Sequence, residues 1–156
     1  MKLATLGIIV KDGKLLLGEK KKGEIGVGVL SGPGGKCETD ETLIECLVRE
    51  TREELDIELD PTSLELVALI DFYNGDTVDF RVYVYRTEKF SGEVCETTDM
   101  IPGWYPVNAL PFDRMYEADR HWFHKAASAA PGTKFMANVF YRERAKKFDR
   151  IEMYPG

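Results

Sequence analysis

Three glutamates, Glu50, Glu53 and Glu54, are spaced so that their side chains meet on one surface of a helix. Residues at positions i, i+3 and i+4 are neighbours on an α-helix, and like charges placed there destabilise it. A chain that keeps three repelling carboxylates this close presents either a solvated acidic face or a site for a hard cation. Mg²⁺ is such a cation, because it prefers carboxylate oxygens as ligands.

The helix that carries these glutamates is predicted to begin after Thr39 or Asp40, either of which can cap it, with Glu41 in its first turn. Placing residues at about 100° per step gives one apolar arc, formed by Ile44, Leu47, Val48, Thr51 and Leu55. The three glutamates lie along the edge of this arc. The far side, toward water, holds Glu41, Glu45 and Arg52. The edge position favours a cleft over a freely solvated surface.

A glycine-rich segment, residues 19–35, precedes this helix. A loop of this length in a small domain is usually functional or mobile. It does not match the P-loop pattern, because Leu30 and Cys37 stand where a glycine and a hydroxyl are required. It also does not match G-x-G-x-x-G, because Ser31 stands at the last glycine position. A phosphate-binding loop and a plain flexible connector therefore both remain open.

Composition narrows the class of protein. The 156 residues are expected to form a single domain, 1–156, with an ordinary 44% hydrophobic and 31% charged content. A net charge of −6 disfavours capture of a nucleic acid polymer. No apolar run approaches the roughly 18 residues that span a membrane, and no secretion signal pattern opens the chain. Three cysteines without metal-type spacing suggest reduced thiols in the cytoplasm.

The remaining elements follow from hydrophobic periodicity and turn residues. Strands are predicted at residues 3–10, 14–18, 64–72, 78–86, 103–107, 135–141 and 148–154, and a second helix at 117–130. Asp12-Gly13 and Asn74-Gly75 are expected to form hairpin turns. Residues 142–147 are left unassigned. This order predicts a mixed β-sheet with helices packed on both sides, an α+β fold of the α/β/α sandwich type.

The segment from residue 35 to residue 57 resembles the Nudix box, G-x5-E-x7-R-E-U-x-E-E-x-G-U, where U is a bulky apolar residue. The matching residues are Gly35, Glu41, Arg49, Glu50, Glu53, Glu54 and Ile57. Thr51 stands where U is expected and Asp56 where the second glycine is expected. Thr51 is nearly as large as valine, and aspartate tolerates the left-handed conformation better than most residues. Neither departure changes a charged position.

The resemblance implies a Nudix fold and a hydrolase that cleaves a nucleoside diphosphate linked to another group. It implies Mg²⁺, with Mn²⁺ as a substitute, held by the Gly35 carbonyl and by Glu50, Glu53 and Glu54. In this chemistry the cation neutralises phosphate charge and lowers the pKa of a bound water. Glu53, Glu54, Arg49 and Asp99 are the implied catalytic residues. Arg49 would orient a glutamate by a salt bridge, and the residue matching Glu41 is more structural.

Further segments, residues 32–36, 99–105 and 110–116, resemble the MutT-homologue branch of this family. That branch hydrolyses oxidised purine nucleoside triphosphates such as 8-oxo-dGTP to the monophosphate and pyrophosphate. The implied substrate-binding residues are Thr5, Lys20, Ser31, Phe72, Val78, Tyr116 and Asp119. Three positions depart from the branch. Tyr116 replaces a tryptophan, Ala118 replaces one of two base-reading aspartates, and Ser31 replaces an asparagine.

Alternatives stay open for the function. The altered base pocket fits another Nudix substrate, such as ADP-ribose, a dinucleoside polyphosphate or a methylated purine triphosphate. A non-catalytic nucleotide-binding module is a third hypothesis, although such modules typically lose box glutamates. The expected partner is a small nucleotide, with the chain as a monomer or a homodimer.

Several residues also have simpler explanations. His121 and His124 lack a third metal ligand and are expected at the surface or in packing. Lys20, Lys21 and Lys22 are by default a solvated charge run, although one of them could meet a phosphate. Aromatic residues such as Trp122 are more often part of the core than of a pocket.

Overall fold

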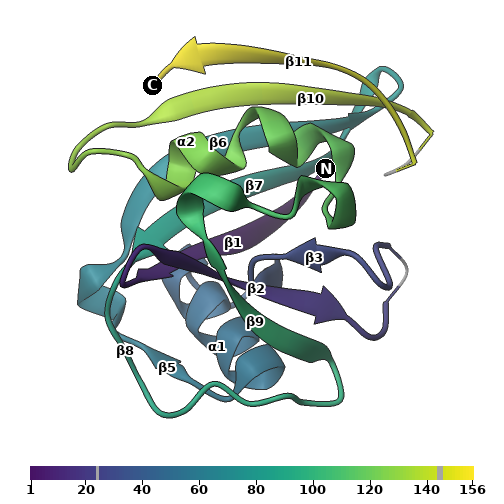
Figure 1. The fold of residues 1–156 in the computed structure, drawn as a ribbon. Coiled ribbons are helices and arrows are strands. Elements are labelled where there is room, and N and C mark those ends of the chain that lie inside the picture. The colour runs from purple at the N-terminus through teal and green to yellow at the C-terminus, as the bar shows by residue number, and fades with distance from the viewer. Residues whose placement is uncertain (24, 144–145) are drawn as a thin grey trace.

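The computed structural model describes residues 1–23, 25–143 and 146–156, and within these ranges one mixed sheet organises the chain. Its strands run in the order β11-β10-β6-β7-β1-β2-β3, with β4 paired to β1 and β9 paired to β2 (Figure 1). The bounds are β1 Lys2–Lys11, β2 Lys14–Lys20, β3 Leu30–Ser31, β4 Gly34–Lys36, β6 Glu65–Asn74, β7 Thr77–Thr87, β9 Met100–Pro106, β10 Phe135–Glu143 and β11 Lys147–Pro155. A separate pair joins β5, Glu58–Leu59, to β8, Phe90–Ser91.

The sheet is mixed because two of its pairings are parallel. β1 runs parallel to β7 and β10 runs parallel to β6, whereas β6–β7, β10–β11, β1–β2 and β2–β9 are antiparallel. Both predicted hairpin turns are present, and Gly13 and Gly75 adopt the positive φ angles of 74° and 63° that favour glycine. The parallel pairings join strands distant in sequence, so they depend on tertiary packing.

Helices cover both faces of the sheet. The helix α1, Leu43–Leu55, packs on one face through Leu47 and Leu55, which belong to the same core cluster as Ile9 and Leu16. The other face is covered by a 3₁₀ helix, Glu117–His121, and by α2, Phe123–Ala127, which lies over β6 and β7 in Figure 1. The predicted α+β fold with helices on both sides is confirmed.

The start of α1 differs from the prediction. Thr42, and neither Thr39 nor Asp40, is the N-cap, because its side chain accepts a hydrogen bond from the backbone of Glu45 while the Glu45 side chain accepts one from the backbone of Thr42. This reciprocal capping box satisfies two backbone donors that a helix start otherwise leaves free. The end agrees with the prediction, since Asp56 adopts the left-handed conformation at φ 59°.

The helix predicted at residues 117–130 is divided at Trp122, where φ is −136°. Trp122 and Phe123 are both fully buried, with ring centroids 4.4 Å apart. Consecutive residues of a regular helix point about 100° apart. A break at Trp122 therefore lets both rings enter the same core, which the periodicity alone did not indicate.

The segment predicted as one long loop, residues 19–35, contains parts of three strands. β2 extends to Lys20, and β3 and β4 pair with β2 and β1. These short strands are held by backbone pairing, including a 2.7 Å hydrogen bond from the Gly7 N–H to the Pro33 carbonyl. Gly34 has φ 144°, and a Cβ there would lie 2.1 Å from the Thr5 carbonyl oxygen. Glycine is thus required for β4 to approach β1.

The C-terminal strands extend the predicted ones by a residue or two at most ends. Residues 144 and 145, within the unassigned stretch, lie outside the described residues. Cys37, Cys46 and Cys95 are free cysteines. In the described part of the chain, no helix is both long enough and apolar enough to span a membrane.

Candidate active site

Glu54 lies deepest of the three glutamates. Its carboxylate accepts a 2.8 Å hydrogen bond from the backbone N–H of Gly34, so α1 and β4 hold it from both sides. Burial raises the pKa of this carboxyl to about 8, because it outweighs the Gly34 hydrogen bond and the Lys20 charge, which lower the pKa, and the Glu50 and Asp99 carboxylates also act to raise it. The ionised form of Glu54 therefore needs positive charge beside it.

Glu50 packs its carboxylate against the backbone of Gly35. A Cβ at Gly35 would lie only 2.7 Å from the Glu50 carboxyl carbon. Desolvation also raises the pKa of Glu50, partly offset by the Arg49 charge. The box glycine is thus needed for a physical reason, since any side chain at this position would push the carboxylate out of place.

Arg49 joins the acidic residues of the segment. Its guanidinium donates two hydrogen bonds to Glu41, at 2.7 and 3.0 Å, and further ones to Glu50 at 3.2 Å and Glu53 at 3.4 Å. Hydrogen bonding from Arg49 lowers the pKa of Glu41 to about 2. The prediction that Glu41 faces water on α1 is wrong. It precedes the helix, and its side chain is only 12% exposed because it closes the pair with Arg49.

Glu53 is the most open member of the set, with a side chain 51% exposed that contacts Arg49. Among the described residues, no three or more histidine, cysteine, aspartate or glutamate side chains are gathered as a metal cluster. Glu50, Glu54 and Asp99 do border one cavity, which also has Gly35, Lys20 and Lys22 in its wall. We call this cavity of about 490 Å³ the carboxylate cleft.

The lysines of the predicted charge run are not equivalent. Lys22 forms a 2.9 Å ion pair with Asp99, which raises the pKa of the lysine. Lys20 donates a 2.7 Å hydrogen bond to the Ile25 carbonyl, and Lys21 pairs with Glu96 at 2.9 Å, away from the cleft. Two ammonium groups, those of Lys20 and Lys22, therefore face the cleft, where phosphate charge would be attracted.

The residues of the carboxylate cleft fit a divalent cation. The donor set consists of carboxylate oxygens and a backbone carbonyl, which hard cations prefer. Two of these carboxylates, Glu50 and Glu54, are partly or largely desolvated and repel each other. A cation between them would offset that cost. Glu50, Glu54 and the Gly35 carbonyl would hold it, whereas Glu53, the third predicted carboxylate ligand, does not line the cleft and lies beside it through its contact with Arg49.

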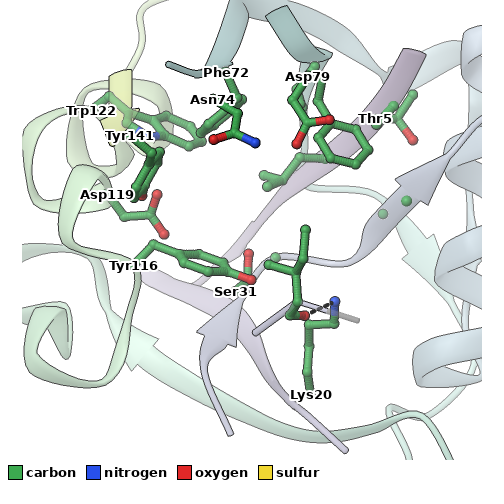
Figure 2. A pocket seen from close by; sticks show the side chains of 18 of the residues that line it. Thr5, Lys20, Ser31, Phe72, Asn74, Asp79, Tyr116, Asp119, Trp122 and Tyr141 are labelled. Carbon is green, nitrogen blue, oxygen red and sulfur yellow. Dashed lines mark hydrogen bonds between the residues drawn. The ribbon is translucent and has the colours of Figure 1, made fainter. Parts of the chain in front are cut away.

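A second cavity, of about 240 Å³, adjoins the cleft and shares Lys20, Gly35 and Glu54 with it. We call it the inner cavity. Six of the predicted substrate-binding residues line it, namely Thr5, Lys20, Ser31, Phe72, Tyr116 and Asp119 (Figure 2). Its volume is below the ~300–1,000 Å³ typical of complete ligand sites. It suits one ring system of a ligand, with the remainder in the cleft.

Val78 is not among the residues that line the inner cavity, unlike its neighbours Asp79 and Phe80. The β6–β7 register shifts between Phe72 and Tyr73, so that Val78 pairs with Tyr73. Asn74, Trp122 and Tyr141 also line the cavity and were not predicted as site residues. The sequence signal at Asn74 is the Asn74-Gly75 pair, which predicts a hairpin turn and does not indicate a binding residue. The sequence indicates Trp122 mainly as a core aromatic.

Asp119 is the buried polar group of the inner cavity. Its side chain is 3% exposed, and its Oδ2 has no hydrogen-bond partner among the described residues; the same holds for Trp122 Nε1. Burial raises the pKa of Asp119 well above its usual range. A neutral carboxyl can both donate and accept a hydrogen bond. The position of the missing second aspartate, Ala118, is fully buried and apolar.

Tyr116 also lines the inner cavity, next to Asp119 in Figure 2, and Gly26, between β2 and β3, packs against it. A Cβ at Gly26, where φ is 79°, would lie 1.8 Å from Tyr116 Oη. Burial raises the pKa of Tyr116 to about 12, so the phenol is neutral. His121 and His124 lie away from both cavities, where His121 stacks on Phe148 at 5.4 Å and His124 Nε2 lies 3.3 Å from Asn108 Oδ1.

Two adjoining cavities beside the carboxylates of α1, on an α+β sandwich, form the candidate site. Comparison with known proteins assigns its family. The NUDIX domain family model matches residues 1–126. The chain belongs to this family, whose hydrolases generally use divalent metal cations.

Named relatives and solved structures agree with this assignment. The chain is 37% identical over 123 residues to the oxidized purine nucleoside triphosphate hydrolase of Danio rerio, covering 78% of this chain and 77% of the relative. It is 31% identical, with the same coverage, to the protein of that name from Mus musculus. The crystal structure of a mutator MutT protein from Bacillus halodurans matches with a TM-score of 0.80 at 18% identity, over 98% of this chain and 97% of that one. The last match supports the fold alone.

Proposed function

We propose that this protein is a Mg²⁺-dependent pyrophosphohydrolase of oxidised purine nucleoside triphosphates. It releases the nucleoside monophosphate and pyrophosphate and so removes damaged nucleotides from the precursor pool. One observation carries the proposal: the carboxylate cleft, suited to metal and phosphates, adjoins an inner cavity lined by a buried carboxyl with one unpartnered oxygen. The names of the relatives from Danio rerio and Mus musculus support the same substrate class.

The residues of the chain have distinct roles in this proposal. Glu50, Glu53, Glu54 and the Gly35 carbonyl hold the cation, which neutralises phosphate charge and activates water when bound. Arg49 orients Glu50 and Glu53 through its hydrogen bonds and is itself held by Glu41. Lys20 and Lys22 face the phosphates. A phosphate that binds Lys22 breaks the ion pair between Lys22 and Asp99, so the Asp99 carboxylate becomes available to the cleft.

The inner cavity holds the base in this proposal. Tyr116 offers a stacking surface, and the Asp119 carboxyl meets the polar edge of the base. Mn²⁺ is proposed as a substitute cation. A cytoplasmic location is proposed from the substrate class and from the free cysteines. No nucleic acid polymer or membrane is proposed as a partner, and the chain acts as a monomer or a homodimer.

The test is steady-state kinetics with Mg²⁺ on dGTP, 8-oxo-dGTP, 2-oxo-dATP, a methylated purine triphosphate and ADP-ribose, with product analysis. We expect the highest kcat/KM for an oxidised purine triphosphate and the release of pyrophosphate. No pyrophosphate from any triphosphate would overturn the proposal.

A second candidate keeps the metal chemistry and changes the substrate. It is favoured by Ala118 and Tyr116, since the branch has a carboxylate and a larger ring at these positions. In the same panel, a preference for ADP-ribose or a methylated purine triphosphate over the oxidised ones would select this candidate.

A further inference from the structure

One further polar group of the inner cavity, besides Asp119, is the side chain of Asn74 at the end of β6. Asn74 lines the inner cavity together with Asp119 and Tyr116. Figure 2 shows its amide directed toward the interior, across the cavity from Tyr116 and Ser31. Among the described residues, the structure records no hydrogen bond for this amide. The amide is therefore available to a ligand.

The position of Asn74 is set by strands on both sides. It pairs with Thr77 in β7 and with Tyr141 in β10, and the next residue, Gly75, donates a 2.9 Å backbone hydrogen bond to the Tyr141 carbonyl. A group on a strand is held more precisely than one on a free loop. The side chain of Asn74 is exposed to solvent. Its backbone, however, is fixed by the pairing of β6 with β7 and with β10.

A purine presents two polar edges, one on each of its rings. The buried Asp119 carboxyl has an unpartnered oxygen, and it can meet the donors of the six-membered ring. An oxidised purine carries an N7–H next to a C8 carbonyl on the other ring, where an unmodified purine carries an acceptor N7 and a C8–H. A primary amide matches the oxidised edge with two hydrogen bonds and the unmodified edge with one.

We propose that Asn74 is a specificity-determining residue that selects the oxidised five-membered ring edge of the base, with its carbonyl accepting from N7–H and its NH₂ donating to the C8 carbonyl. This inference rests on the proposed function for the choice of substrate class. It assigns to Asn74 part of the base reading that the apolar Ala118 does not supply.

The experiment measures equilibrium binding of 8-oxo-dGMP and dGMP by calorimetry with the metal chelated, so hydrolysis plays no part. Asn74→Leu replaces the amide with an apolar group of similar shape. Asn74→Asp replaces the NH₂ donor with an oxygen, which only accepts hydrogen bonds when ionised. The matched control is Asn138→Leu. Asn138 is also an asparagine on a strand, β10, but it lines neither cavity.

We expect both Asn74 variants to bind 8-oxo-dGMP about tenfold more weakly, as loss of well-placed hydrogen bonds predicts, and dGMP with a smaller loss. Asn138→Leu should bind both like wild type. An unchanged ratio of the two dissociation constants in Asn74→Leu, or wild-type binding by Asn74→Asp, would overturn the inference. Absence of any preference in the wild type would also overturn it.

The two proposals fail in different ways. A wild-type protein that hydrolyses no triphosphate but shows Asn74-dependent preference for 8-oxo-dGMP contradicts the proposed function and supports this inference. Hydrolysis of 8-oxo-dGTP that is selective in both wild type and Asn74→Leu supports the proposed function and contradicts this inference.

Discussion

Individual side chains set the chemistry, and two buried carboxyls dominate it. Glu54 and Asp119 both have raised pKa values because burial disfavours their ionised forms. Their surroundings differ, however. Glu54 lies among other carboxylates in a cleft that fits a cation, whereas Asp119 lies among aromatic rings. The first is suited to be ionised by a metal and the second to stay neutral against a base.

Glu54→Gln tests the metal assignment. Glutamine keeps an oxygen for the Gly34 hydrogen bond, so the fold should be retained, but it removes the charge that the cation needs. We expect kcat to fall at least about 100-fold, because metal catalysis supplies several kcal/mol. Steady-state kinetics with Mg²⁺ measures this. Turnover near the wild-type rate would contradict the role of Glu54, and an unfolded variant would be recognised by circular dichroism.

Asp119 predicts a pH dependence of stability. Its folded-state pKa is raised above the unfolded value of about 3.9. The contribution of Asp119 to the free energy of unfolding is therefore fully present below pH ~3.9 and is lost as the pH rises toward the folded-state pKa. Asp119→Asn cannot ionise. The free energy of unfolding of this variant, relative to wild type, should therefore increase as pH rises from 5 to 8. Urea unfolding at several pH values measures it, and a constant difference would contradict the prediction.

At the scale of elements, the site is the meeting of α1, β4 and the loop that joins β2 to β3. The capping box of Thr42 and Glu45 starts α1 in the register that directs Glu54 to Gly34. Gly34 and Gly35 bring β4 close to β1 and to Glu50. The loop packs Gly26 on Tyr116, so it forms part of the inner cavity wall.

The capping box can be tested with a matched pair of variants. Thr42→Ala removes the hydrogen bond to the Glu45 backbone and should reduce the free energy of unfolding by about 1 kcal/mol. Thr39→Ala, at an exposed threonine that precedes the helix, should have almost no effect. Urea unfolding of both variants compares them. Equal losses would show that Thr42 is not the cap that matters.

The loop contact has a matched control as well. Gly26 and Gly28 both have positive φ, 79° and 86°, but only a Cβ at Gly26 meets Tyr116. Gly26→Ala should lower kcat/KM for a purine triphosphate by about tenfold, because overpacking typically costs ~1–3 kcal/mol and displaces the ring. Gly28→Ala should introduce a similar backbone strain, because φ is also positive there, but it should leave kcat/KM close to the wild-type value. Equal kinetics in the two variants would contradict a role for the contact.

The whole molecule is a mixed sheet with helices on both faces, and residues of β1 line both cavities. The parallel pairing of β1 with β7 places Thr5 beside Tyr83 and brings the N-terminal strands next to residues from the middle of the chain. Because α1 and β4 both contribute to the carboxylate cleft, a cation bound there joins them. Metal binding should therefore stabilise the entire fold.

This linkage predicts that Mg²⁺ or Mn²⁺ raises the unfolding midpoint. A cation that binds only the folded state adds about 2.7 kcal/mol when it is present at 100 times its dissociation constant. Differential scanning calorimetry with and without the cation measures the shift. Glu54→Gln should abolish most of it, whereas Glu65→Gln, at an exposed position on β6, should retain it. A shift of equal size in both variants would place the cation elsewhere.

Much of this protein was determined by local sequence. The hairpin turns, the amphipathic α1 and the spacing of Arg49, Glu50, Glu53 and Glu54 are short-range features, so periodicity and a family motif sufficed to predict them. The true cap, Thr42, was also local, but Thr39 and Asp40 have side chains of the same capping type nearby. The Asp56 helix end was predicted because aspartate tolerates the left-handed conformation.

Only the tertiary structure decided which residues share the inner cavity. The parallel pairings, the register shift that leaves Val78 out, and the break that buries Trp122 all depend on contacts between distant segments. The same packing buries the Asp119 carboxyl with one oxygen unpartnered and directs Asn74 inward. Spacing along one helix was enough to indicate the metal chemistry, whereas selection of a base depends on walls assembled from strands far apart in the chain.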